Sequence, residues 1–320
     1  MMATATIAAW LVGLCLDNYR NTILMLYEVP YNFDEALISF YQKEASNINY
    51  LYLPPYQEDA NNTRSSIQTR TKGHCYMPQS RAEYEIHLHR IHSAGLRFVV
   101  LWQEHDRLLT RNNLDYYCGM NASGFIVAND KNAAIIKDYN PELLAICSIV
   151  QRTCTDIGQK DLSKYDYVIL YYPFNRGLDA LKQLPQLRDK LVIMPNTMCN
   201  VNCPSIHHWF PTNDHPFDAA TDCWMNIGSV DMCGLILPEH LHLFDRYVGG
   251  YKLQGREYPT AAIKYLCQHY FKRKATKDFV GHFFRRDMAD KFYRLIQEIT
   301  PEVYYNTKTP EIITALSRVL

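Results

Sequence analysis

Short apolar runs alternate along the chain with segments of helical periodicity, and this alternation limits the fold more than any other feature. Strands separated by helices predict a parallel sheet, because a helix supplies the crossover that each parallel pair needs. Eight such strands close a barrel, and an open doubly wound sheet is the rival arrangement. No Gly-x-Gly-x-x-Gly follows the first run to support a dinucleotide-binding fold. We therefore predict an α/β fold, a TIM-like (βα)8 barrel, with strands at Thr4–Gly13, Ile48–Leu53, Phe98–Trp102, Gly124–Ala128, Leu143–Cys147, Tyr167–Tyr171, Leu191–Met194 and Gly250–Leu253.

The segments between these runs carry helix start and stop signals. Asn32-Phe33-Asp34-Glu35 has the spacing of a capping box, in which two side chains bond the first free N–H groups of a helix. Ser80 and Glu83 repeat that spacing, and Gly95 follows as a stop signal. Both segments are therefore predicted to be helices on the outside of the sheet.

The chain beyond the eighth run is expected to be helical as well. Pro259 opens one helix at its first turn, and Thr309-Pro310 caps the last. The helix between them is marked by an apolar stripe of Met288, Phe292, Leu295 and Ile299. We assign residues 1–256 to the barrel and residues 257–320 to helices that pack on it within the same domain.

Composition excludes some functions. The formal net charge is zero, so no basic field favours nonspecific binding to nucleic acid or to an anionic membrane. The apolar start, Met1–Leu16, lacks the basic n-region and the cleavage site of a signal peptide, so a buried strand is the preferred interpretation. No stretch reaches the ~18 apolar residues of a membrane span. We expect a cytoplasmic protein whose ten cysteines are reduced.

Four of the cysteines gather between the seventh and eighth runs, at Cys199, Cys203, Cys223 and Cys233. Three residues separate Cys199 from Cys203, so one turn of chain can direct both thiolates at one ion. Four thiolates from a single connection suit zinc and a four-iron cluster equally well on spacing alone. Radical S-adenosylmethionine chemistry is set aside, because Ile206 stands where a third cysteine would be needed. The alternative is four unrelated cysteines, some of them merely buried.

Several stretches of the chain resemble a known family. They are Asp161–Asp179, Asn196–Pro204 and Val230–Arg256. Leu237-Pro238-Glu239 stands where that family has a helix start of the Leu-Pro-Glu type, and Lys252-Leu253-Gln254-Gly255-Arg256 where it has Lys-Ile-Glu-Gly-Arg. From about Asn18 to about Lys272, the order of segments is similar to that of the collagenase-like peptidase family (peptidase family U-32).

The resemblance implies a barrel with its site at the carboxyl ends of the strands. It also implies a four-iron, four-sulfur cluster and oxygen-independent hydroxylation of RNA pyrimidines or of a quinone-precursor ring. Cys199 matches the first family cysteine, and Cys233 matches the cysteine of the family's Asp-Leu-Cys. Cys203 departs from the usual six-residue gap, and Cys223 agrees in order but not in spacing. Gln254 replaces the family's glutamate, which questions an acid–base role at that position.

Eight further residues are candidates for the site. Arg256 ends the eighth run, where a guanidinium can fork onto a carboxylate or a phosphate. His207 lies beside the cysteine pair and could bind metal or carry protons, with simple packing as the alternative. A structural hydrogen bond is the alternative role for Asn175 and Asn196. The candidate catalytic residues are Arg256, Arg176, Asn175 and His207, and the candidate substrate-binding residues are Arg70, His74, Asn196 and Lys252.

Three functions are compatible with these observations. The first is an iron–sulfur-dependent redox enzyme of the hydroxylase type, acting on a small-molecule or RNA-borne aromatic substrate. The second is a peptidase, disfavoured because the chain has no His-Glu-x-x-His and no Gly-x-Ser-x-Gly. The third is a non-catalytic subunit with a structural zinc site, paired with a homologous barrel subunit, because some members of the resembled family are heterodimers.

Overall fold

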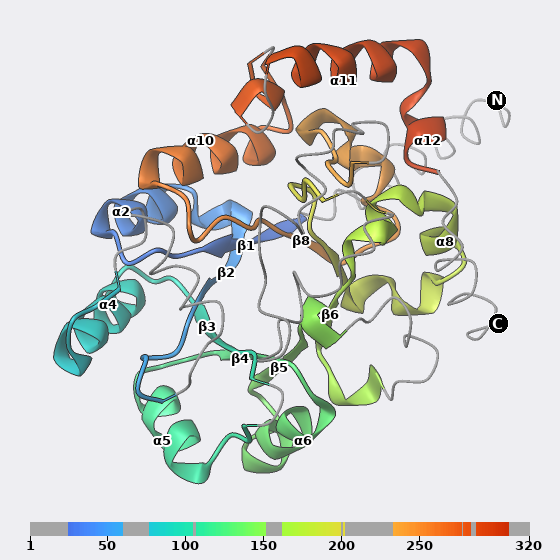
Figure 1. Ribbon diagram of the computed structural model, residues 1–320. Coiled ribbons are helices and arrows are strands. Elements are labelled where there is room, and N and C mark those ends of the chain that lie inside the picture. Colours follow the sequence, from blue (N-terminus) through green and yellow to red (C-terminus); the bar gives the residue numbers. More distant parts are fainter. Residues whose placement is uncertain are drawn as a thin grey trace, which may run out of the picture.

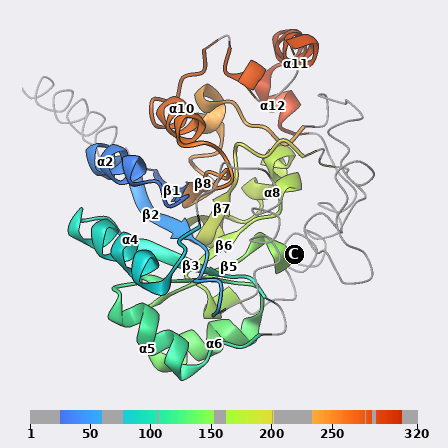
Figure 2. The same cartoon turned by 60° about the vertical axis from the view of Figure 1, so that its left-hand side comes forward.

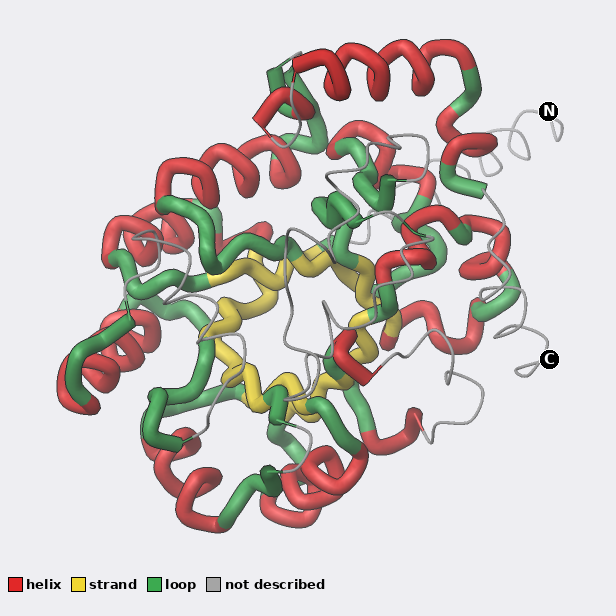
Figure 3. Tube along the Cα trace, in the orientation of Figure 1, coloured by secondary structure: helices red, strands yellow, loops and turns green. Residues whose placement is uncertain are grey.

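The computed structural model describes residues 25–59, 77–104, 107–151, 162–199, 201, 233–276, 278–282 and 286–306. Within these residues, eight parallel strands close a barrel in sequence order, and helices surround it (Figure 1). Figure 3 shows the strands as a closed ring with the helices outside. The predicted TIM-like (βα)8 barrel is confirmed. The strands are β1 (Leu26–Pro30), β2 (Ile48–Leu53), β3 (Phe98–Trp102), β4 (Gly124–Val127), β5 (Leu144–Cys147), β6 (Tyr167–Ile169), β7 (Leu191–Ile193) and β8 (Gly250–Lys252).

The prediction of the first strand is wrong. Leu26–Pro30 takes the first place in the barrel, and it pairs with β2 on one side and with β8 on the other. Thr4–Gly13 lies outside the described residues. Glu28 interrupts the apolar pattern of β1, and Pro30 ends it early, so the segment looked less like a buried strand than the longer apolar run before it. The other seven predicted strands are confirmed with small shifts at their ends.

The helices lie between and after the strands (Figure 1). The α-helices are α2 (Glu35–Lys43), α4 (Arg81–Ser93), α5 (Arg111–Gly119), α6 (Asp130–Tyr139), α8 (Leu178–Lys182), α10 (Thr260–Phe271), α11 (Arg286–Glu298) and α12 (Pro301–Tyr304). Short 3-10 turns are η1 (Ala45–Asn47), η2 (Ile149–Gln151), η3 (Leu162–Lys164), η4 (Tyr172–Arg176), η5 (Pro185–Lys190), η8 (Pro238–Leu243) and η9 (Val280–His282). None of these helices combines the length and the apolar character that a membrane crossing requires.

Local signals account for where two of these helices begin and end. Ser80 caps α4 by accepting the Glu83 N–H at 3.2 Å, and Gly95 follows that helix with a φ of 71°. This left-handed conformation is open to glycine at little cost, so the stop signal acts as predicted. At α2 the cap is Asp34 and not Asn32: the Asp34 carboxylate accepts the Ala36 N–H at 2.9 Å.

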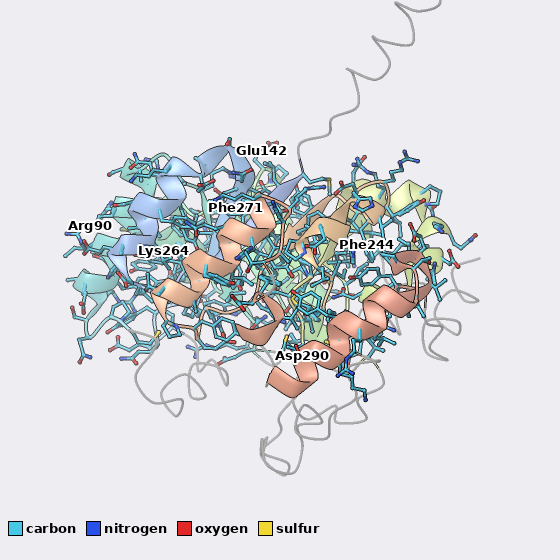
Figure 4. The ribbon with its side chains drawn as sticks, turned by 90° about the horizontal axis from the view of Figure 1, so that it is seen from above. Arg90, Glu142, Phe244, Lys264, Phe271 and Asp290 are labelled. Atoms are coloured by element: carbon cyan, nitrogen blue, oxygen red, sulfur yellow. The ribbon has the colours of Figure 1, made fainter. Side chains whose placement is uncertain are left out.

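The helices that follow β8 pack together on one side of the barrel (Figure 2). α10 begins directly after Pro259, as predicted, and its Phe271 ring stacks on Phe40 of α2 at 6.5 Å. Figure 4 labels Phe271 on α10 and Asp290 on α11. From the expected stripe of α11, Phe292 is fully buried and meets Tyr304 at 5.8 Å. The cap predicted at residues 309–310 lies outside the described residues.

Two apolar clusters form the core, and strand alternation separates them. Tyr50 and Tyr52 belong to one cluster, whereas their neighbours Leu51 and Leu53 belong to the other. Successive side chains of a strand point to opposite faces, so the first cluster fills the barrel and the second lies between strands and helices. We call the first the interior cluster: Tyr50, Tyr52, Val99, Leu101, Ile126, Ala128, Ile146, Ile149, Val150, Ile169, Tyr172, Val192, Met194 and Val201.

Candidate functional site

The chain leaves β8 in a turn, residues 253–258, that carries Arg256; we call it the Arg256 turn. Tyr52 on β2 donates its hydroxyl to Leu253 O at 2.6 Å. Asn32, just past β1, donates Nδ2 to Tyr258 O at 3.2 Å. Because these bonds hold both ends of the turn from two other strands, its position relative to the barrel is fixed.

Asn196, just past β7, fastens the middle of the turn. Its Nδ2 donates to Gln254 O at 2.8 Å, and its Oδ1 accepts the Gln254 N–H at 2.9 Å. Gln254 Nε2 in turn donates to Asn196 O at 3.2 Å and to Thr197 Oγ1 at 2.8 Å. Asn196 is fully buried, so the geometry favours the structural role that the sequence left open for it.

Gly255 allows the turn to close on itself. Its φ is 127°, in the region that side chains rarely adopt, and a Cβ added there would lie 2.5 Å from Cδ2 of Tyr258. The Tyr258 ring therefore lies against the glycine backbone. The glycine beside Arg256 is thus required by a close approach as well as by the backbone conformation.

Arg256 is itself 6% exposed. Its charge acts on Tyr52: burial raises the pKa of the Tyr52 hydroxyl well above its ordinary value, Glu257 adds to the rise and Arg256 opposes it. A guanidinium offers five N–H donors in a fixed fork. Arg256 is held in a turn at the carboxyl end of β8, and its binding of a carboxylate or phosphate stays a prediction.

Lys252, the last residue of β8, extends into the barrel. Its Nζ lies 3.5 Å from the centroid of the Tyr52 ring, which belongs to the interior cluster. Glu28 Oε2, on β1, lies 3.6 Å from the same nitrogen. Lys252 and Arg256 therefore both act on Tyr52, one at its ring and the other through the charge felt by its hydroxyl.

Asn175 and Arg176 are placed as positioning residues. Asn175 Nδ2 donates to Met194 O at 2.7 Å and to Gly234 O at 2.6 Å, which joins β7 to the chain that returns at residue 233. Arg176 donates to Cys233 O at 3.1 Å, and its guanidinium lies 3.6 Å from the centroid of the Tyr304 ring. Both side chains are almost fully buried, so their geometry favours a structural role over contact with substrate.

The two described cysteines of the predicted metal site are neighbours in the backbone. Gly234 N donates to Cys199 O at 2.9 Å, so residues 199 and 234 of the connection between β7 and β8 lie side by side. Their side chains differ in surroundings. Cys199 packs on the interior cluster, whereas Cys233 lies in the outer cluster, the one between the strands and the helices. Burial raises the pKa of Cys233 to about 12, although the Leu235 N–H and Arg176 oppose the rise.

The remaining predicted residues cannot be placed. Cys203, Cys223, His207, Arg70 and His74 lie outside the described residues. In the part of the chain that is described, no group of three or more His, Cys, Asp or Glu side chains is arranged to hold a metal ion.

Other polar groups at the carboxyl ends of the strands were not predicted. Tyr171 and Tyr172 follow β6 with ring centroids 4.3 Å apart, and the Tyr171 hydroxyl donates to that of Tyr172 at 3.2 Å. Gln103 follows β3, and its Nε2 donates to Ser148 Oγ, past β5, at 2.8 Å. Glu104 has a pKa raised by burial, with Arg107 opposing. The signal available in the sequence was position alone, since each of these residues comes directly after a strand.

The chain matches no protein-family model, and no curated protein matches it. The class of protein therefore follows from the fold and the site. It is a parallel (βα)8 barrel in which polar side chains gather where β7, β8, β1 and β2 end. Barrel enzymes place their chemistry at this face.

Proposed function

We propose that the protein is an iron–sulfur barrel enzyme of the oxygen-independent hydroxylase type, acting on a small or RNA-borne aromatic substrate. The observation that carries this proposal is the joining of the cysteine connection to the Arg256 turn. Cys199 O accepts the Gly234 N–H, and three residues before Cys199 the Asn196 side chain holds Gln254. Hydrogen bonds thus connect the cysteine-bearing loop to the turn that carries the Arg256 guanidinium.

The backbone brings Cys199 and Cys233 close together, but only the Cys199 side chain lies at the barrel interior. Cys199 is half-buried against the barrel interior, which suits a ligand at the carboxyl face. The Cys233 Sγ lies 3.6 Å from Met198 O in the outer cluster, so it would have to turn to join Cys199. We assign Cys199, Cys203, Cys223 and Cys233 as the ligands, and a bound four-iron cluster would supply electron transfer. Zinc is the alternative metal for the same four thiolates.

The described residues can bind and orient a substrate. Arg256 provides a fork of donors for a carboxylate or phosphate, and the Asn196–Gln254 bonds keep it in place. Tyr171, which follows β6, is half-buried, and stacking on an aromatic ring is how proteins commonly hold single nucleobases. The peptidase alternative is disfavoured because the chain has no His-Glu-x-x-His and no Gly-x-Ser-x-Gly.

We also place the protein in the cytoplasm, because a reducing compartment keeps thiols free. Among the described cysteines, Cys118, Cys233 and Cys267 are free thiols.

Anaerobic purification tests the proposal, with iron and zinc assayed on the sample that gives the visible spectrum. About four irons per chain and a brown colour are expected, as for one four-iron cluster. Cys199→Ala should lose both, whereas Cys267→Ala, a buried thiol of α10, should keep them. A colourless protein without iron would overturn the cluster. Zinc without iron would mean that the cysteines form a structural metal site. Co-purification of a homologous barrel would then favour the non-catalytic subunit.

A further inference from the structure

A carboxylate and an ammonium face each other inside the barrel. Glu28 and Lys252 are paired residues of neighbouring strands, β1 and β8, and their side-chain atoms approach to 3.6 Å. They are 1% and 5% exposed, and Tyr50 beside them is fully buried. The cluster therefore puts opposite charges at a place that TIM barrels ordinarily fill with branched apolar side chains.

Stability alone gives little reason for this pair. Removing two charges from water costs several kcal/mol per ion, and only close geometry with further hydrogen bonds offsets that cost. Neither carboxylate oxygen of Glu28 accepts a hydrogen bond with good geometry from the residues that the structure describes. Well-packed apolar residues are often as stable as such a pair or more so. Buried ionisable groups with perturbed pKa values cluster at functional sites, so this pair is a candidate for chemistry.

The surroundings of Lys252 suit an amine that must give up its proton. Its Nζ lies on the Tyr52 ring in the water-excluding interior cluster, with the Glu28 carboxylate as its nearby partner. Burial raises the pKa of Glu28, and Lys252 and the Tyr50 hydroxyl oppose the rise. A carboxyl group that binds a proton more readily is a better acceptor for the ammonium proton. The transfer converts two buried charges into a neutral acid and a free amine.

We propose that Lys252 is a nucleophilic amine that forms an imine with a small aldehyde or ketone bearing a carboxylate or phosphate. Lys252 passes one proton to Glu28, and the Nζ lone pair attacks the carbonyl carbon as the C=O π bond breaks. The resulting oxygen is protonated and leaves as water when the C=N bond forms. Overall, the carbonyl compound and the ammonium group give a protonated imine and one water, so no oxidant or reductant is consumed. Desolvated lysines use this chemistry in other proteins.

The anionic group on the substrate follows from Arg256. Lys252 ends β8, and Arg256 follows it by four residues in the turn whose Leu253 O accepts the Tyr52 hydroxyl, while the Lys252 Nζ lies on the Tyr52 ring. A compound whose carbonyl carbon lies next to a carboxylate, as in a 2-oxo acid, presents an electrophile and an anion a short distance apart. This part of the inference rests on the anion-binding role proposed for Arg256. The amine chemistry itself is independent of the iron–sulfur cluster.

Reductive trapping tests the inference directly. The protein is incubated with pyruvate and cyanoborohydride, and peptide mapping by mass spectrometry locates the resulting carboxyethyl group. We expect Lys252 to be labelled well before Lys264, a lysine on the outer helix α10 (Figure 4). Acetone, which has no carboxylate, should label Lys252 at least about tenfold more slowly, as expected when one charged anchor of about 1.4 kcal/mol or more is lost. Arg256→Lys should bring the rates at which pyruvate and acetone label Lys252 closer together, because a lysine cannot fork onto the carboxylate.

Variants separate the chemistry from folding. Lys252→Met should abolish the adduct at this position, and Glu28→Gln should slow it about tenfold or more while its circular dichroism stays native. Labelling of Lys264 and other surface lysines with Lys252 untouched in the wild-type protein would overturn the inference without any variant. The same rates with iron-loaded and iron-depleted protein are expected. The imine therefore stands or falls separately from the cluster, which only the metal assay tests.

Discussion

The two halves of the barrel interior are built differently. On the side of β8, β1 and β2 the interior side chains are charged or phenolic: Lys252, Glu28, Tyr50 and Tyr52. On the side of β3 to β6 they are mainly aliphatic: Val99, Leu101, Ile126, Ala128, Ile146 and Ile169. Both halves share the same parallel register and the same inward and outward alternation, so the difference lies in the residues alone.

The difference shows where stability and chemistry are kept apart. The aliphatic half is stabilised by close packing alone, because its side chains have no polar group that needs a hydrogen bond. The charged half carries the Glu28–Lys252 ion pair, in which the Glu28 carboxylate accepts no hydrogen bond of good geometry from the described residues. The Arg256 turn, which Asn196 holds by hydrogen bonds, follows Lys252 directly along the chain. A barrel that concentrates polar groups at the ends of neighbouring strands has localised its site there.

Breaking the ion pair should have the largest effect on stability. Glu28→Ala removes the carboxylate that faces the buried Lys252 ammonium and should lower the free energy of unfolding by about 3–5 kcal/mol. Urea unfolding measures this change. Glu142→Ala, at an exposed carboxylate labelled in Figure 4, should stay within about 0.5 kcal/mol of wild type.

A double replacement sharpens the same point. Glu28→Leu combined with Lys252→Met removes both charges and should recover most of the lost stability, because apolar side chains of similar volume replace a buried pair without large cost. Recovery would show that the pair is kept for something other than folding. A double variant as unstable as Glu28→Ala would make the pair a structural element.

The aliphatic half should respond to lost volume instead of lost charge. Ile126 is fully buried in the interior cluster, so Ile126→Ala should cost about 3 kcal/mol from reduced burial and the cavity that remains. Urea unfolding gives the value, and the labelling of Lys252 by pyruvate should be unchanged in the folded variant. A change in that labelling as large as the one in Glu28→Gln would contradict the separation of the two halves.

The Arg256 turn should be sensitive to a single atom. Gln254 Nε2 donates to Asn196 O and Thr197 Oγ1, and a glutamate would bring an oxygen to the same carbonyl. Gln254→Glu should therefore cost about 1–3 kcal/mol, the range for a buried polar group left without its partner. Gln268→Glu on the exposed face of α10 serves as the control in the same thermal or urea unfolding measurement. Equal stability of the two variants would show that these bonds do not hold the turn.

Sequence reasoning reached most of the fold because apolar runs and caps are local signals. The seven confirmed strands each carry an apolar core, and Ser80 and Gly95 mark helix ends by chemistry that needs no distant partner. β1 escaped because an interior glutamate has no local explanation. Its partner Lys252 is 224 positions away, the difference between the two residue numbers joined by the ion pair.

Among the predicted site residues, those that the structure describes can be placed, but their roles stay predictions. Both Arg256 and Lys252 lie at the end of β8; Lys252 contacts the Tyr52 ring, and the Tyr52 hydroxyl bonds Leu253 O in the turn that carries Arg256. Asn175 and Asn196 were also chosen, yet their amides bond to backbone atoms across long stretches of chain. Side-chain partners so distant in sequence leave no periodic pattern, so sequence reasoning could find the residues but could not distinguish anchoring from contact with substrate.

The smallest expected effect is a pH dependence of the free energy of unfolding that comes from the charged half alone. Burial raises the pKa of Glu28 in the folded protein above the value of about 4.3 that a free glutamate has when the chain is unfolded. Above about pH 4.3, the unfolded chain has lost the Glu28 proton while the folded protein still holds it. The contribution of Glu28 to stability therefore falls as the pH rises from there through the raised pKa. The slope cannot exceed about 1.4 kcal/mol per pH unit for one group.

Urea unfolding of wild type and Glu28→Gln from about pH 5 to about pH 8 isolates this contribution, because the variant lacks the titrating carboxyl group. We expect the wild type to lose stability relative to the variant as the pH rises. Ile126→Val, in the aliphatic half, should follow the wild-type pH profile in parallel, because it changes no titratable group. A difference between wild type and Glu28→Gln that stays constant or grows with pH would mean that Glu28 enters the barrel already ionised at no cost, and the contrast between the two halves would then be one of shape only.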